Sequence, residues 1–442
     1  MASAAEQLAA NLNFSAFSKA EELKKRIWFT LGALIIYRIG TYIPLPGIDF
    51  VRWEELFAQQ SGGVMGIFNT FAGGAVERMS IFALNIMPYI SSSIIIQLMT
   101  SVVPHLEQLK KDGESGRKQI NQYTRYLTVL LATGQGFAIA QSLQAANVAM
   151  NPGFFFIFSV VVTLVGGTVF LMWLGEQVTA RGVGNGISLI IFTGIVAEFP
   201  RALYQMLQLG KQGALSAPVL VLTFVGLAAI LAVIVFVERA QRRLLIQYPK
   251  RQQGNRMFGG ETSHMPLKLN TAGVIPPIFA SSLLILPLTI AGFLATGGPE
   301  WLGFVTSWLG AGQPLYFVFY ASLIIFFCFF YTAIVFNPDD TADNLKKYGG
   351  FIPGIRPGKR TAEYLDYVLT RLTVVGALYL TLVCLIPEIA RSRMGLAFTF
   401  GGTSLLIVVS VTLDTVAQVQ SHLLAHQYEG LIKKSKLRGN RT

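Results

Sequence analysis

Residues 214–237 read ALSAPVLVLTFVGLAAILAVIVFV and contain no charged side chain. As an α-helix these 24 residues would extend about 36 Å, which exceeds the roughly 30 Å hydrocarbon core of a bilayer. The stretch therefore predicts a membrane-spanning helix. Working outward from it, charges and loop residues delimit ten such spans: 27–43, 79–103, 126–148, 154–175, 183–204, 214–237, 270–295, 314–336, 368–387 and 394–413.

Composition supports a membrane protein. Of 442 residues, 52% are hydrophobic and only 13% are charged, and the mean hydropathy is +0.53. Soluble domains carry about a quarter charged residues, so a cytosolic globular enzyme is excluded. Two cysteines, both within apolar runs, and four histidines predict no disulfide framework, metal site or cofactor. The predicted fold is an all-α membrane protein of ten spans.

The Lys and Arg residues orient these spans. The N-terminus, alternate loops and C-terminal tail together hold 28 of the 35 Lys and Arg residues, and the opposite loops hold six. Positive loops remain in the cytoplasm, so both termini are predicted to be cytoplasmic. Segment 1–22 is then a cytoplasmic N-terminal segment, and 421–442 is a basic cytoplasmic tail.

Weak internal similarity indicates a duplicated architecture. Pro88, Ile90 and Ser93 of the second span recur at the same offsets in the seventh, and residues 185–191 are echoed by 401–407. Five spans per half would make the two halves inverted in the membrane. We therefore expect an N-terminal half over 23–213 and a C-terminal half over 214–420.

Charged residues within the spans are few and lie toward the span ends. Arg38, Glu198, Arg201, Arg371 and Asp414 are interpreted as interfacial anchors, because long side chains there can reach water. An ion-coupled transporter needs a charged or polar midplane site, which the spans do not supply. A membrane-embedded enzyme would need a nucleophile with its base, or a metal set, and neither is evident. These two classes remain the alternatives to a channel.

Two further features bear on function. The apolar segment 62–75 is too short to cross the bilayer and too apolar for an external loop, so we expect it to re-enter the protein. The cytoplasmic loops 239–269 and 337–371 carry seven and six Lys or Arg residues. Clustered arginines among glycine and proline favour docking of an anionic partner, such as RNA phosphates or an acidic protein face, over simple attraction to lipid headgroups.

At this level of detail the chain resembles the SecY family, the channel subunits of Sec preprotein translocases, and its gammaproteobacterial members in particular. The resemblance runs from about Leu23 to the tail. The segments that carry it are 37–40 (YRIG), 81–84 (IFAL), 86–90 (IMPYI), 94–98 (IIIQL), 122–126 (QYTRY), 182–187 (GVGNGI), 272–276 (AGVIP), 336–338 (FNP), 341–345 (TADNL), 352–358 (IPGIRPG) and 400–407 (FGGTSLLI).

The resemblance implies a non-enzymatic protein-conducting channel of the bacterial inner membrane, which passes unfolded secretory polypeptides and releases signal or transmembrane helices laterally. It implies as partners the SecE and SecG subunits, the SecA ATPase, the ribosome, client proteins and lipid. The implied site residues are a pore ring of Ile86, Ile90, Ile187, Ile191, Ile278 and Ile407; a plug at 62–75 with Val64, Ile67, Phe68 and Phe71; a lateral gate with Ser91, Ser92, Gln97, Ser281, Ser282 and Leu286; and a docking surface with Arg356, Arg243, Lys250, Arg251, Arg256 and Arg360.

Overall fold

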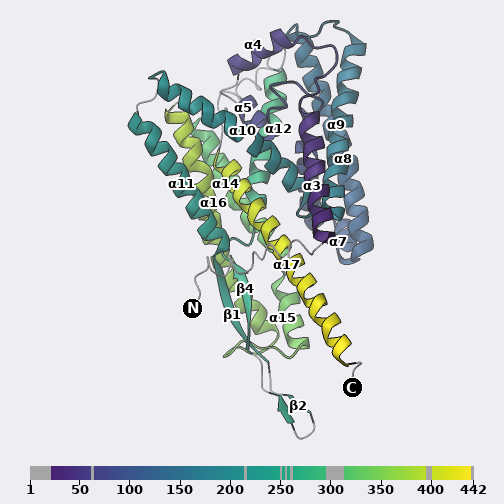
Figure 1. Ribbon diagram of the computed structural model, residues 1–442, viewed down its shortest axis with the longest axis vertical. Coiled ribbons are helices and arrows are strands. Elements are labelled where there is room, and N and C mark those ends of the chain that lie inside the picture. Colours follow the sequence, from purple (N-terminus) through teal and green to yellow (C-terminus); the bar gives the residue numbers. More distant parts are fainter. Residues whose placement is uncertain are drawn as a thin grey trace. The chain divides into compact units, whose positions relative to one another are not determined.

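The computed structural model describes residues 21–60, 64–213, 217–248, 251–253, 256–258, 262–294, 313–394 and 401–439 (Figure 1). They are predominantly helical and form two compact units. Unit 1 comprises the described residues up to Tyr204, the end of one helix from Pro287, and the residues from Ile407 onward. Unit 2 comprises the described residues of 205–286 and 307–406. These units differ from the two inverted halves predicted on either side of residue 213. The division into halves stays a prediction.

Unit 1 contains the N-terminal helices. They are α3 (Glu21–Gly40), α4 (Phe50–Gln60), α5 (Val64–Phe71), α6 (Met87–Val102), α7 (Pro104–Lys111), α8 (Glu114–Ala145), α9 (Phe154–Arg181) and most of α10 (Gly186–Lys211), with α17 (Gly402–Gly439) from Ile407. Its hydrophobic core joins Trp53 of α4, Met79, Ala140 of α8 and Leu164 of α9. The core therefore encloses the turns that follow α5.

Unit 2 combines long helices with a small hairpin. Its elements are α11 (Ala217–Arg239), β1 (Gln241–Gln247), β2 (Arg251–Gln253), β3 (Arg256–Phe258), β4 (Thr262–Lys268), α12 (Ile275–Leu294), α14 (Pro314–Val335), α15 (Pro338–Lys347) and α16 (Lys359–Met394). Strands β1 and β4 pair antiparallel from Gln241 opposite Lys268 to Gln247 opposite Thr262. Figure 1 shows β1, β4 and α15 at the same end of this unit.

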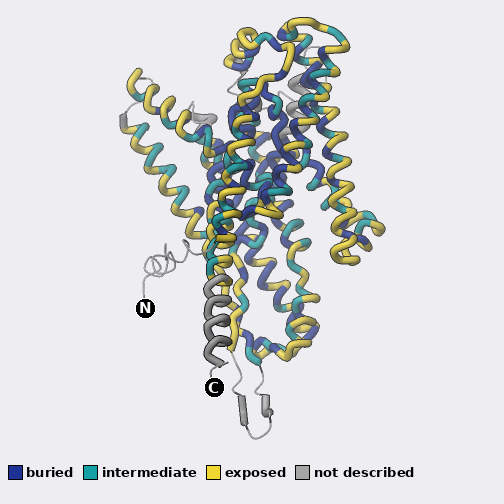
Figure 2. Tube along the Cα trace, turned by 45° about the vertical axis from the view of Figure 1, so that its right-hand side comes forward, coloured by how far each residue is buried: buried dark blue, intermediate teal, exposed yellow. Residues whose placement is uncertain are grey.

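Exposed residues run along the long helices (Figure 2), and many of them are large hydrophobic residues. In the described part of the chain, six helices are long and apolar enough to cross a membrane, namely α9, α10, α11, α14, α16 and α17. Counting α6 and α7, which bend by 98°, as one span gives seven. The most apolar window, in α11, has a mean hydropathy of 3.1 and only 6% of it is buried inside the protein. Such a surface is stable in lipid and not in water, so the chain is a multi-pass membrane protein.

The count of ten spans stays a prediction, but three further helices lie where the sequence places spans. Helices α3, α8 and α12 overlap the expected segments 27–43, 126–148 and 270–295.

The expected boundaries of the second span, 79–103, differ from the structure. Residues 79–86 form turns, with Met79 and Asn85 at positive φ, and the helix begins only at Met87. Pro88 therefore lies in the first turn of α6, where a missing N–H does no harm, and not at mid-span.

The similar sequences 185–191 and 401–407 each contain a glycine at the start of a helix that packs closely on the preceding helix. A Cβ on Gly186, at the start of α10, would overlap the carbonyl oxygen of Gly175 on α9. Likewise, a Cβ on Gly402, at the start of α17, would overlap the carbonyl oxygen of Val383 on α16. In both cases glycine lets one helix begin directly against the backbone of the preceding helix.

Candidate functional site

The predicted re-entrant segment contains a short helix inside unit 1. Helix α5 has eight residues and would extend about 12 Å, far too short to span a bilayer. Phe71 at its end is 5% exposed, and Phe68 packs against the core of unit 1. Val64 and Ile67 belong to α5, but their side chains lie outside the described set. The two described phenylalanines of α5 thus pack against the rest of unit 1.

The chain leaving α5, residues 72–80, is called the exit turn below. Carbonyl groups of residues 71–73 accept hydrogen bonds from three side chains of unit 1. Asn85 Nδ2 donates to the first carbonyl at 2.6 Å, the Tyr37 hydroxyl to the second at 3.5 Å, and Arg38 Nη1 to the third. The indole N–H of Trp53 lies 3.1 and 3.0 Å from the carbonyl oxygens of residues 76 and 77. Helices α3 and α4 and the turn before α6 therefore all hold this segment.

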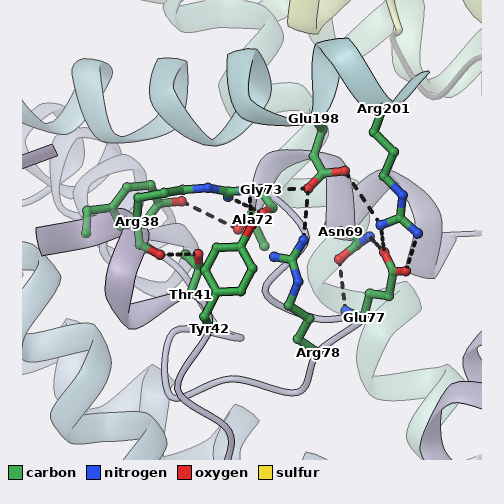
Figure 3. Close-up of polar contacts among 11 residues, drawn as sticks. Arg38, Thr41, Tyr42, Asn69, Ala72, Gly73, Glu77, Arg78, Glu198 and Arg201 are labelled. Atoms are coloured by element: carbon green, nitrogen blue, oxygen red, sulfur yellow. Dashed lines mark hydrogen bonds and ion pairs between the residues drawn. The ribbon is translucent and has the colours of Figure 1, made fainter. Parts of the chain in front are cut away.

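A group of five charged residues surrounds the exit turn; we call it the charge cluster. It consists of Arg38, Glu77, Arg78, Glu198 and Arg201 (Figure 3). Arg201 of α10 binds Glu77 with two hydrogen bonds of 2.6 and 2.7 Å. The Glu198 carboxylate lies 3.7 Å from both Arg38 and Arg78, and 4.0 Å from Arg201. Planar guanidinium and carboxylate groups in paired contact fix distance and orientation together.

Glu77 also contacts α5 directly. The Asn69 side chain accepts from the Glu77 backbone N–H at 2.9 Å and donates to the Glu77 carboxylate at 3.3 Å. On the other side of the cluster, the guanidinium carbons of Arg38 and Arg78 lie 5.2 and 4.2 Å from the centre of the Tyr42 ring. These contacts connect α3, α5, the exit turn and α10 in one polar network.

Two glycines allow the exit turn to approach α10. Gly73 has φ of +64° and Gly74 has φ of +79°, conformations that side-chain-bearing residues rarely adopt. A Cβ on Gly73 would lie 2.7 Å from the Cα of Gly194 on α10, and a Cβ on Gly74 would overlap the Glu198 carboxylate. The exit turn therefore packs on the backbone of α10 without an intervening side chain.

None of the six isoleucines of the predicted pore ring is exposed. Ile86, Ile90, Ile191 and Ile407 are 0%, 7%, 5% and 1% exposed, and Ile187 and Ile278 are half-buried. Four of the six side chains are therefore packed inside the protein, and the other two are partly accessible. Ile278 belongs to unit 2 and the other five to unit 1, so the closed ring itself stays a prediction.

The predicted lateral-gate residues lie on two helices, one in each unit. Ser91 and Ser92 of α6, and Ser281 and Ser282 of α12, are buried. Two of these hydroxyls donate within their own helices: Ser92 to the Pro88 carbonyl at 2.8 Å and Ser281 to the Ile278 carbonyl at 2.9 Å. The buried Oε1 of Gln97 has no hydrogen-bond partner among the described residues. The side chain of Leu286 lies outside the described set. Pairing across a gate stays a prediction.

The two basic loops meet in one folded part of unit 2. The backbone groups of Gln247 and Phe351 exchange hydrogen bonds of 2.9 and 3.0 Å, which joins the second loop to β1. Leu244, Leu267 and Ile352 form a shared hydrophobic cluster beneath them. The three described docking residues, Arg243 on β1, Arg356 in the loop before α16 and Arg360 in its first turn, are all exposed. Lys250 and the side chains of Arg251 and Arg256 lie outside the described set.

The interpretation of Arg38, Glu198 and Arg201 as interfacial anchors was incomplete. In the structure all three belong to the charge cluster, and Glu198 is only 8% exposed. One signal could have indicated this: Gly194, Glu198 and Arg201 follow one another at helical spacing on one face of span five. Their partners near residues 38 and 77 cannot be derived from such spacing.

Comparison with known proteins identifies relatives over nearly the whole chain. The SecY family model matches residues 80–416. "Protein translocase subunit SecY" of Escherichia coli is 56% identical over 423 residues, covering 95% of this chain and 96% of that protein. A solved structure describing how the plug domain of a SecY protein stabilises the closed channel superimposes with a TM-score of 0.67 at 18% identity, covering 90% of this chain and 92% of that one. Sec61 in a canine ribosome–channel complex gives a TM-score of 0.64 at 17% identity with the same coverage. At these identities the two solved structures establish likeness of fold.

Proposed function

The chain belongs to the SecY family, and from this premise and the geometry of unit 1 we propose that it is a protein-conducting channel. It passes unfolded secretory polypeptides across the bacterial inner membrane and releases signal or transmembrane helices laterally into lipid. No catalytic residues are required, because the driving force comes from a bound motor or from the ribosome.

The observation that carries this proposal is the buried helix α5 with its fixed exit turn. Residues 62–75 act as a plug that closes the outer side of the pore. On the cytoplasmic side of the plug, the constriction is a ring of Ile86, Ile90, Ile187, Ile191, Ile278 and Ile407. Aliphatic side chains exclude water and hydrated ions from a narrow passage. They also present no hydrogen-bonding groups, so they do not discriminate between client sequences.

The family resemblance assigns lateral release to two helices, α6 and α12, which carry Ser91, Ser92, Gln97, Ser281, Ser282 and Leu286. A client segment of about 20 apolar residues gains free energy on entering lipid, whereas each charged residue at its centre costs about 2.5–3.5 kcal/mol. Hydroxyls that bond within their own helices, as Ser92 and Ser281 do, need no partner on another helix, which favours a gate that opens at modest cost.

The joined basic loops of unit 2 form the docking surface for the SecA ATPase or the ribosome. Arg356, Arg243 and Arg360 are exposed on it, and the resemblance assigns Lys250, Arg251 and Arg256 to the same docking role. Guanidinium groups suit phosphates and carboxylates alike. This surface faces the cytoplasm, with both termini on the same side, and SecE and SecG complete the membrane complex.

Ion conductance of vesicles containing the purified complex tests the channel. Complex lacking residues 62–75 should conduct ions at rest, while wild-type complex should stay sealed. A secondary transporter, the main alternative, has no continuous pore to unplug, so deletion would leave its ion conductance unchanged. Equal conductance of the deleted and intact complexes would therefore refute the proposal.

A further inference from the structure

We infer that helix α10 holds the closed plug in place, and that Glu198 and Arg201 are its positioning residues. This inference rests on the proposed role of residues 62–75 as the plug. The closed plug rests on the face of α10 that carries Gly194, Glu198 and Arg201, and we call this face the plug seat.

The first link runs from α10 to α5 through Glu77. Arg201 binds the Glu77 carboxylate at 2.6 and 2.7 Å, and Glu77 binds the Asn69 side chain of α5 through both its backbone and its carboxylate. Arg201 and Glu77 are 124 residues apart in sequence, so this pair ties two separate parts of the chain. A displacement of α5 that carries the exit turn with it must break this two-point contact.

The second link depends on Glu198. Its side chain is 11% exposed and faces two arginines at 3.7 Å, one on α3 and one in the exit turn. Of these, Arg38 also donates to the Gly73 carbonyl at the end of the plug. Without Glu198 the guanidinium groups of Arg38 and Arg78 would repel each other in a poorly solvated space. The Glu198 carboxylate therefore holds Arg38 against the exit turn and holds Arg78, within that turn, against α10.

The same face of α10 continues to the predicted constriction. Ile187, Ile191, Gly194, Glu198 and Arg201 are spaced by 4, 3, 4 and 3 residues, which places them within about 80° of arc at 100° per residue. Ile191 and Glu198 are about 10.5 Å apart along the helix axis. A client chain that pushes Ile191 aside therefore moves the helix that holds the plug. The plug is thereby released by occupation of the pore.

A purely structural role for the charge cluster makes a different prediction. If the ion pairs only stabilised the fold of unit 1, any comparable pair in that unit would serve equally. Arg125 of α8 and Glu176 of α9 supply the matched control, because they also form a two-point pair, with distances of 2.9 and 2.7 Å. Among the described residues, no hydrogen bond or ion pair joins this pair to α5 or the exit turn.

The experiment measures resting ion conductance and thermal unfolding of the complete complex in vesicles. Glu77→Gln, Arg201→Gln and the double variant are compared with Arg125→Gln, Glu176→Gln and their double variant. Each change in the first pair should raise resting conductance on the order of tenfold, since it removes a charge-assisted contact of the closed plug. The double variant should conduct no more than the stronger single variant, because both changes remove the same contact.

Two further variants extend the test. Glu198→Gln should also raise conductance, while Arg201→Lys, which keeps the charge but loses the two-point geometry, should give an intermediate value. Conductance raised equally by both pairs, or additive effects of Glu77→Gln and Arg201→Gln, would overturn the inference. The inference would also be overturned if the point variants stayed sealed to ions while the complex lacking residues 62–75 conducted. That result would still support the proposed channel. A sealed deletion would instead refute the channel itself.

Discussion

Replacing Gly73 by alanine should open the resting channel. The residue lies in the exit turn with φ of +64°, where an L-residue with a Cβ is strained by about 1–2 kcal/mol. In addition, the new Cβ would lie 2.7 Å from the Cα of Gly194. Both atoms are tied to backbone, so the overlap is relieved only if the exit turn moves away from α10.

The two contributions can be combined into an expected change in the closed state. Forced overpacking of one methyl group costs about 1–3 kcal/mol, so the sum is about 2–5 kcal/mol. A shift of that size lowers the ratio of closed to open plug by roughly 30-fold to several thousand-fold. We expect resting conductance in vesicles to rise, with little change in motor-driven transport of clients.

Gly113→Ala is the matched control for backbone strain. Gly113 has φ of +70°, also lies in unit 1, and no heavy atom of the described residues lies within 4 Å of its added Cβ. It should therefore carry the conformational cost without the overlap, and the channel should stay sealed. Conductance in Gly73→Ala no higher than in Gly113→Ala would refute close packing of the exit turn on α10.

Three other changes test separate parts of the structure. Arg356→Glu should abolish motor-driven export without lowering the thermal unfolding temperature, because Arg356 is exposed; normal export would refute its docking role. Gly402→Ala should destabilise the protein by about 3 kcal/mol, since its Cβ would overlap the backbone of α16, whereas Gly226→Ala on α11 should be neutral in a thermal unfolding assay. Cysteines in place of Ser91 and Leu286, once crosslinked, should block insertion of signal-bearing clients, and undiminished insertion in fully crosslinked protein would exclude a gate there.

Much of the helical framework follows from the sequence for a simple reason. A span such as that in α11 needs only uncharged length to be recognised, and its partner is lipid. The start of α6 could not be found this way. Residues 79–86 are as apolar as a helix would be, but turns with positive φ at Met79 and Asn85 hold them. Strands β1 and β4 were likewise missed, because only their pairing, from Gln241 to Lys268, distinguishes them from a charged loop.

The candidate site also has a part that the sequence predicts and a part that it does not. A short helix inside the protein at Val64–Phe71 was predictable, because a short apolar run between glycines has few places to go in a membrane protein. The charge cluster was not, because its pairs join residues such as Glu77 and Arg201 that no local period relates. Each charge alone is indistinguishable from an interfacial anchor. Only the fold shows that opposite charges converge on the exit turn.

An ionic seat gives the plug a property that an apolar seat would lack. Two unit charges 3.7 Å apart, as at Glu198 and Arg38, attract by about 4.5 kcal/mol at an effective dielectric constant of 20 and by about 1.1 kcal/mol in water, before desolvation is counted. Water that reaches Glu198 as the plug lifts therefore weakens its pairs with Arg38 and Arg78 up to about fourfold. An apolar contact gains strength when its surroundings become wet, and it would draw the plug back. The charges around Glu198 thus stabilise the closed state while water is excluded from them. They stabilise it less once a client has begun to displace the plug.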